Sequence, residues 1–187
     1  MRKKFWLDLI ILSLVLCFSS VAFAKSLPTK KQTVLGLYVT AQQAFAKWHT
    51  NSDKIKILDV RTSGEYIFVG HAPMAANVPF KFLTGVNKSK KKLAMTKNKD
   101  FVKEVKKRFK KTDTIFLMCR SGGRSAAAVN MLAKSGFKNL YSVTDGFEGN
   151  ALKVKTSYNL GKRVLDGWKN SGAPWTYKLD PNLVYAP

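Results

Sequence analysis

The stretch Thr114–Asn130, TIFLMCRSGGRSAAAVN, decides how this chain is expected to fold. Its apolar start, Ile115–Met118, predicts a buried strand, and the small residues Ala126–Leu132 predict a helix that continues to about Lys134. Between them lies a cysteine that is followed by a glycine-rich turn. The backbone N–H groups of such a turn converge on one point, and the helix dipole adds positive potential there. We therefore expect Cys119 to be a nucleophilic thiolate in a cradle that also holds an anionic substrate.

The segments around this stretch alternate between strand and helix patterns. Strands are predicted over Val34–Val39, Lys54–Val60, Ala75–Phe80, Ile115–Met118 and Leu140–Val143, and helices over Ala41–Trp48, Gly64–Val69, Asp100–Lys110 and Ala126–Lys134. Thr40 and Ser63 are the expected N-caps of the first two helices. Such alternation favours an α/β fold with a central parallel five-stranded sheet and helices on both faces. The lysine-rich Lys81–Lys99 is expected to be a surface loop, and Arg163–Ser171 a further helix.

The first residues have the layout of a secretory signal peptide. Basic residues Arg2–Lys4 precede the apolar run Leu9–Ser20, and Ala22–Ala24 is a small-x-small cleavage pattern. We expect cleavage after Ala24, so that residues 1–24 are a signal peptide and residues 25–187 form a single domain. The protein is then exported, and periplasmic in a Gram-negative bacterium. An uncleaved N-terminal membrane anchor is the alternative, although the apolar run is short for a span of about 20 residues.

Cysteine usage and charge narrow the class of function. The chain has two cysteines, and cleavage would remove Cys17, so Cys119 would have no partner for an intramolecular disulfide. The net charge of +22 comes from lysines that are spread along the chain without the interleaved aromatic residues that stack on bases. We therefore expect no specific nucleic-acid binding, and the charge is interpreted as a general solubility device. Weak attraction to an anionic surface or an acidic partner is the alternative.

Three sequence elements resemble those of rhodanese-like domains. They are DVRTSGEYIFVGHAPMAANVP (59–79), CRSGGRS (119–125) and GWKNSGAP (167–174), and they occur in the family's order. The resemblance covers a core of about 34–175. The chain departs from the compact pattern by about 15 extra residues, 150–164, which are similar to an insertion in an exported subgroup.

The resemblance implies a sulfurtransferase that carries sulfane sulfur as a persulfide on Cys119. The sulfur would come from a small anionic donor such as thiosulfate and pass to cyanide or a thiol, protein thiols included. The residues implied to bind the substrate and the persulfide are Arg120, Ser121, Gly122, Gly123, Arg124 and Ser125, and those implied to support the site are Asp59, Arg61 and Glu65. No metal and no organic cofactor is implied.

Loop length separates this chemistry from that of related phosphatases. Cys119 to Arg124 spans six residues, whereas related cysteine-dependent phosphatases and arsenate reductases have one more, which gives room for a phosphate-sized oxyanion. Two further alternatives stay open. One is a module of the envelope that carries persulfide without turnover or binds a protein partner. The other is a thiol that becomes oxidised to a mixed disulfide.

Overall fold

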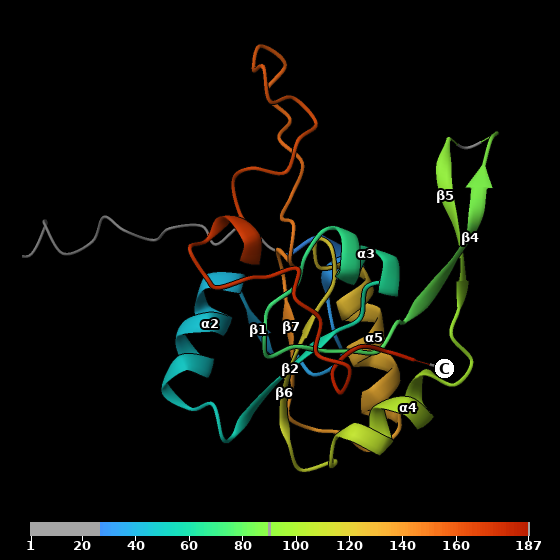
Figure 1. Cartoon of the computed structure of the whole chain (residues 1–187), viewed down its shortest axis with the longest axis vertical. Helices are drawn as coiled ribbons and strands as arrows, with labels where there is room; N and C mark the ends of the chain where they lie inside the picture. The colour runs from blue at the N-terminus through green and yellow to red at the C-terminus, as the bar shows by residue number, and fades with distance from the viewer. Residues whose placement is uncertain (1–26, 90, 187) are drawn as a thin grey trace, which may run out of the picture.

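The computed structural model describes residues 27–89 and 91–186, so the predicted signal peptide lies outside the described residues. Within this part of the chain, five parallel strands form one sheet in the order β1-β7-β6-β2-β3 (Figure 1). The strands are β1 (Tyr38–Val39), β2 (Ile55–Asp59), β3 (Ala76–Asn77), β6 (Thr114–Met118) and β7 (Leu140–Val143). The sheet confirms the predicted α/β fold, although β1 and β3 are shorter than expected.

Helices cover both faces of this sheet, as predicted. They are α2 (Ala41–Thr50), α3 (Ser63–Phe68), α4 (Phe101–Arg108) and α5 (Gly123–Lys134), with short 3₁₀ helices η1 (Thr29–Lys31) and η2 (Trp168–Asn170). One hydrophobic cluster joins the sheet to α4 and α5, and the other joins it to α2 and η2. None of the helices in the described ranges is long and apolar enough to cross a membrane.

Strand β6 shows why its apolar run predicted a buried position. Ile115 and Leu117 belong to the cluster with α4 and α5, whereas Phe116 and Met118 belong to the cluster with α2. Successive side chains of a strand point to opposite faces, so a strand that is covered on both sides is apolar throughout. This central strand ends directly before Cys119, and it therefore places the cysteine at the carboxyl edge of the sheet, where ligands bind in open α/β folds.

The predicted helix starts are confirmed in one case and corrected in the other. Thr40 caps α2: its hydroxyl accepts from the Gln43 N–H at 3.2 Å, and the Gln43 side chain accepts from the Thr40 N–H at 2.9 Å. Ser63 is not the cap of α3 but its first residue, because the hydroxyl of Thr62 accepts from the Glu65 N–H at 3.2 Å. The Glu65 carboxylate in turn accepts a hydrogen bond from the Thr62 N–H. This reciprocal capping box starts α3 at Ser63, one residue before the predicted start at Gly64.

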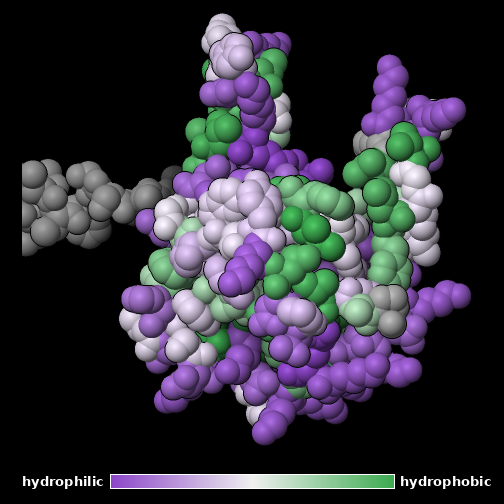
Figure 2. Space-filling model, viewed as in Figure 1, coloured by the Kyte–Doolittle hydropathy of each residue, from purple (hydrophilic) through white to green (hydrophobic). Residues whose placement is uncertain are grey.

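The expectation of a surface loop over Lys81–Lys99 is wrong. Strands β4 (Lys81–Asn87) and β5 (Lys92–Lys97) pair as an antiparallel hairpin that projects from the body of the domain (Figures 1 and 2). Buried Asn98 closes its base, since its N–H donates to the Phe80 carbonyl at 3.1 Å and its side-chain amide to the Pro79 carbonyl at 2.9 Å. The hairpin is therefore anchored to the chain that leaves β3.

The expected helix over Arg163–Ser171 is also wrong, since only η2 forms there. The physical reason is a close crossing of backbone at Gly149 and Gly167. Gly167 has φ +89°, and a Cβ atom on it would lie 2.3 Å from the Gly149 nitrogen. Segment 150–166 thus leaves and re-enters the domain at one point, and it forms a second projection in Figures 1 and 2.

Candidate active site

Cys119 lies in the turn between β6 and α5. The N–H of Gly122 donates to its sulfur at 3.2 Å. The cysteine is only 1% exposed. The turn wraps the sulfur closely, and access is through a pocket of about 680 Å³ that Cys119 helps to line.

The backbone of the turn is oriented by the segment that follows β7. The Phe147 N–H donates to the Cys119 carbonyl at 2.7 Å, and the N–H groups of Glu148 and Gly149 donate to the Arg120 carbonyl at 3.0 and 3.2 Å. These contacts hold the carbonyl oxygens of the turn. The first N–H groups of α5 have no partner inside the helix, so donors remain available beside the sulfur.

Only glycine fits at position 122 of this turn. Its φ is +94°, and a Cβ atom here would lie 2.1 Å from the Thr144 carbonyl oxygen. Ser125 secures the same point from the helix side, because its buried hydroxyl donates to the Gly122 carbonyl at 3.0 Å and accepts from Ser142 at 3.2 Å. Ser121 and Gly123 line the pocket.

Arg124 also lines the pocket, and its guanidinium is held from α3. Two of its nitrogens donate to the two carboxylate oxygens of Glu65, at 2.7 and 2.6 Å. Burial by itself raises the pKa of Glu65, but the hydrogen bonds and the charge of Arg124 outweigh it and hold that pKa at about 2. Burial likewise opposes the charge of Arg124, and Glu65 more than compensates, so the pKa of Arg124 is raised. Glu65 thus joins the start of α3 to the start of α5.

Replacing Glu65 by glutamine is expected to lower the free energy of unfolding at neutral pH by about 3 kcal/mol. The folded-state pKa of about 2 lies below the ordinary 4.5, so the carboxylate's contribution is complete above pH 4.5 and is lost as the pH falls through 2. Urea unfolding measured along this range should show wild type and variant converging toward acid pH. Glu104→Gln, which removes a partner of the more exposed Lys107, is the control and should cost under about 1 kcal/mol. A constant difference between wild type and Glu65→Gln at all pH values would contradict the assignment.

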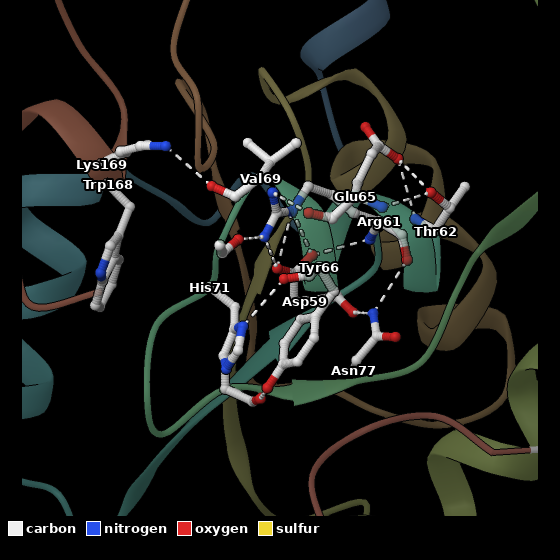
Figure 3. A network of polar contacts seen from close by, with 12 residues as sticks. Asp59, Arg61, Thr62, Glu65, Tyr66, Val69, His71, Asn77, Trp168 and Lys169 are labelled. Atoms are coloured by element: carbon white, nitrogen blue, oxygen red, sulfur yellow. Dashed lines mark hydrogen bonds and ion pairs between the residues drawn. The ribbon is translucent and has the colours of Figure 1, made fainter. Parts of the chain in front are cut away.

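Asp59 and Arg61 form a fully buried ion pair behind the turn (Figure 3). The Arg61 Nη2 donates to Asp59 Oδ2 at 2.6 Å, and Nε approaches both carboxylate oxygens at 3.0 and 2.9 Å. Arg61 also donates to the Gly70 carbonyl at 2.8 Å, and its guanidinium carbon lies 4.0 Å from the centre of the Phe147 ring. The backbone N–H of Phe147 donates to the Cys119 carbonyl, so the Asp59–Arg61 pair supports the turn through Phe147. Neither member of the pair lines the pocket.

Other residues of the segment 59–79 stabilise the backbone around the Asp59–Arg61 pair. The Asn77 amide donates to the carbonyls of Asp59 and Arg61 at 3.0 and 3.1 Å. The buried His71 ring stacks on Tyr66 with centroids 3.8 Å apart and contacts the Tyr66 and Lys178 carbonyls through its two nitrogens. These contacts agree with a structural role for His71.

The pocket over Cys119 is cationic, with an apolar side. Its apolar wall consists of Phe80, Leu93, Met95 and Ala127, and its basic side chains are Lys30, Lys81, Lys91, Arg120 and Arg124. Sequence reasoning missed the contributions of η1 and of the hairpin. The alternation of Leu93 and Met95 with polar or small residues was the available signal for β5, whereas nothing in the sequence marks Lys30 as a pocket residue.

Lys31 is a second cation that sequence reasoning missed. It is 8% exposed, and its ammonium donates to the Thr144 carbonyl at 2.8 Å and to the Asn150 side chain at 2.9 Å. Burial lowers the pKa of Lys31, while the charges of Asp166 and of an ionised Cys119 act in the opposite direction. Lys31 therefore ties the turn region to the base of segment 150–166.

A family model described as the rhodanese-like domain matches residues 42–152. The chain belongs to this family. The solved structures that resemble this rhodanese-like domain include that of Rv0390 from M. tuberculosis, with a TM-score of 0.59 and 27% identity. That likeness covers 75% of this chain and 96% of the other.

Curated relatives share the rhodanese-like region. Thiosulfate sulfurtransferase 16, chloroplastic, of Arabidopsis thaliana is 37% identical over 92 residues, which are 49% of this chain and 70% of that protein. An uncharacterised protein of Rickettsia prowazekii is 46% identical over 68 residues, or 36% of this chain and 46% of the relative. The match thus spans about half the length of the Rickettsia protein.

Proposed function

We propose that this rhodanese-like domain is a sulfurtransferase that moves sulfane sulfur from a donor such as thiosulfate to a thiophilic acceptor through a persulfide on Cys119. The observation that carries the proposal is the position of the Cys119 sulfur: it accepts an N–H from the turn and lies in a pocket with five basic side chains. The signal-peptide pattern of residues 1–24 supports an exported role.

In the first stage, the ionised sulfur of Cys119 attacks the outer sulfur of thiosulfate. A new S–S bond forms, the S–S bond of the donor breaks, and sulfite leaves with the electron pair of the broken bond. Lys30, Lys81 and Arg120 line the pocket and attract the dianionic donor. The N–H of Gly122 and the first N–H groups of α5 then stabilise the negative charge on the persulfide.

In the second stage, an acceptor attacks the outer sulfur of the persulfide. With cyanide, a C–S bond forms, the S–S bond breaks, and thiocyanate leaves while the Cys119 thiolate returns. No external oxidant or reductant is consumed. Cys119 is the only cysteine in the described part of the chain, so nothing within it can take the sulfur as an internal disulfide partner.

The depth of Cys119 also favours a second candidate, a persulfide carrier with slow turnover. A thiol that is 1% exposed protects its sulfur from solvent thiols, as a carrier requires. The two candidates share the first stage and differ in the rate of the second.

Intact mass spectrometry of the full chain tests the proposal. After incubation with thiosulfate, the mass should rise by one sulfur atom, and cyanide should remove that atom with formation of one equivalent of thiocyanate. Continuous thiocyanate formation identifies the enzyme, whereas loading without sustained turnover identifies the carrier. If thiosulfate and other sulfane donors leave the mass unchanged, both candidates are wrong.

A further inference from the structure

The projecting hairpin has one apolar face. Leu83 pairs with Met95 and Val86 pairs with Leu93, and a bulge between Leu83 and Gly85 lies between these two pairs. Directly opposed residues of antiparallel strands share a face, and Leu93 and Met95 are two positions apart on one strand. The bulge therefore shifts the register of β4 so that all four apolar side chains stand on the same side of the hairpin.

This apolar face is turned toward the pocket over Cys119. Leu93 and Met95 line that pocket directly, together with Lys81 from the base of β4. On the neighbouring strand β4, directly opposite Met95 and Leu93, Leu83 is 53% exposed and Val86 64% exposed, so the apolar surface extends beyond the pocket. In Figure 2, the hydrophobic surface of the hairpin lies along its inner side, facing the second projection.

The surroundings of this face are basic. Residues 81–99, which include the hairpin, contain lysine but no aspartate or glutamate. Segment 150–166 contains lysine and arginine and one acidic residue, Asp166, whose carboxylate accepts hydrogen bonds from Asn150 at the base of the projection. Exposed Lys88 and Lys91 lie at the turn of the hairpin, and Lys91 also lines the pocket. A partner of complementary charge is acidic, and such complementarity steers its approach.

The size of the surface exceeds what the proposed small substrates use. The pocket of about 680 Å³ falls among sites that hold organic ligands of drug size, roughly 300–1,000 Å³. Thiosulfate and cyanide are far smaller, and neither one reaches the exposed Leu83 and Val86. The apolar side chains face the pocket, whereas lysines occupy the tip of the hairpin. This geometry favours an occupant that binds over Cys119, rather than a membrane that the tip of the hairpin would contact.

We infer that the apolar face of the hairpin, formed by Leu83, Val86, Leu93 and Met95, docks an acidic segment of an acceptor protein and places that segment's cysteine over Cys119. The inference rests on the proposed function and names the acceptor class of the same site. The acceptor thiolate attacks the outer sulfur of the Cys119 persulfide, a new S–S bond forms on the acceptor, and the Cys119 sulfur leaves as thiolate. Electrons balance without any co-reactant.

Synthetic peptides test this docking with the full chain loaded with sulfur. Three peptides each carry one cysteine: one is flanked by apolar and acidic residues, one by apolar and basic residues, and one by acidic residues without apolar ones. Mass spectrometry follows the sulfur atom from protein to peptide. The acidic-apolar peptide should be the fastest acceptor, by about tenfold over each of the other two.

The double variant Leu83→Ser/Val86→Ser should lose about tenfold in transfer to the acidic-apolar peptide while retaining discharge to cyanide, since neither side chain lines the pocket. Val34→Ser is the matched control, because Val34 is 70% exposed and does not line this pocket. Far-UV circular dichroism and the melting temperature verify that both variants fold.

Equal rates with the three peptides, or an unchanged rate in the double variant, would overturn the docking inference. A membrane role would also overturn it. In that case the wild type would bind vesicles of phosphatidylglycerol and phosphatidylcholine and show no preference among the peptides, and the double variant would lose the vesicle binding. Failure of the proposed function is a separate outcome: it appears earlier, as absence of any sulfur on Cys119.

Discussion

Replacing Cys119 by serine is expected to abolish thiocyanate formation from thiosulfate and cyanide, with a loss of at least about 10³-fold. A serine hydroxyl is un-ionised at neutral pH, and it cannot form the S–S bond that the first stage requires. Serine differs from cysteine at this site by one atom, so β6 and the turn before α5 should be unchanged. Thiocyanate assays and intact mass spectrometry measure the loss of both turnover and sulfur loading.

The fold of the Cys119→Ser variant is the internal control. The cysteine is buried and makes one hydrogen bond through its sulfur, from the Gly122 N–H, which a hydroxyl oxygen also accepts. The melting temperature should therefore stay close to that of the wild type. Sulfur loading that persists in a folded Cys119→Ser protein would place the nucleophile elsewhere and refute the proposed chemistry.

Replacing Asp59 by asparagine is expected to lower the free energy of unfolding by about 3–5 kcal/mol. Both members of the Asp59–Arg61 pair are fully buried, so the variant leaves the guanidinium charge of Arg61 in the interior with a neutral partner. The desolvation cost of that charge is no longer offset. Urea unfolding, followed by the fluorescence of Trp48, Trp168 and Trp175, measures the change.

Two further variants separate this effect from a general loss of charge. Glu104→Gln removes one member of the pair with Lys107, whose side chain is 59% exposed, and should cost under about 1 kcal/mol. Asp59→Asn/Arg61→Met removes both buried charges and should be less destabilised than Asp59→Asn alone. If the double variant has the lower free energy of unfolding of the two, the unpaired charge of Arg61 is not the cause of the destabilisation in Asp59→Asn.

The sheet and the cysteine turn can be predicted from the sequence because their signals are local. The buried part of β6, Ile115–Met118, is apolar in every position, and a glycine-rich turn follows it in the sequence. The resemblance implies that Glu65 supports the site, and the structure shows it capping α3 and binding Arg124. Which arginine it binds depends on how α3 and α5 meet, and no local pattern contains that information.

Strand β4 of the hairpin escaped prediction because its apolar residues break the alternation of a strand. Leu83 and Val86 are three positions apart, and only the bulge between them brings both to one face. The false helix over Arg163–Ser171 has the opposite cause, since Val164, Leu165 and Trp168 have helical spacing. There the backbone crossing at Gly167 overrides the local preference, because a left-handed residue cannot continue an α-helix.

The crossing of Gly149 and Gly167 has a consequence for insertions and deletions in the segment that it closes. A loop whose two ends meet can lengthen, shorten or be exchanged while its point of attachment stays fixed, and each doubling of loop length costs only about 0.6 kcal/mol in closure entropy. A change in the length of segment 150–166 is therefore expected to leave the geometry of the Cys119 turn and of the sheet intact. Such a change would alter the surface that Asn150, Ala151 and Arg163 form beside Ser121 and Gly123.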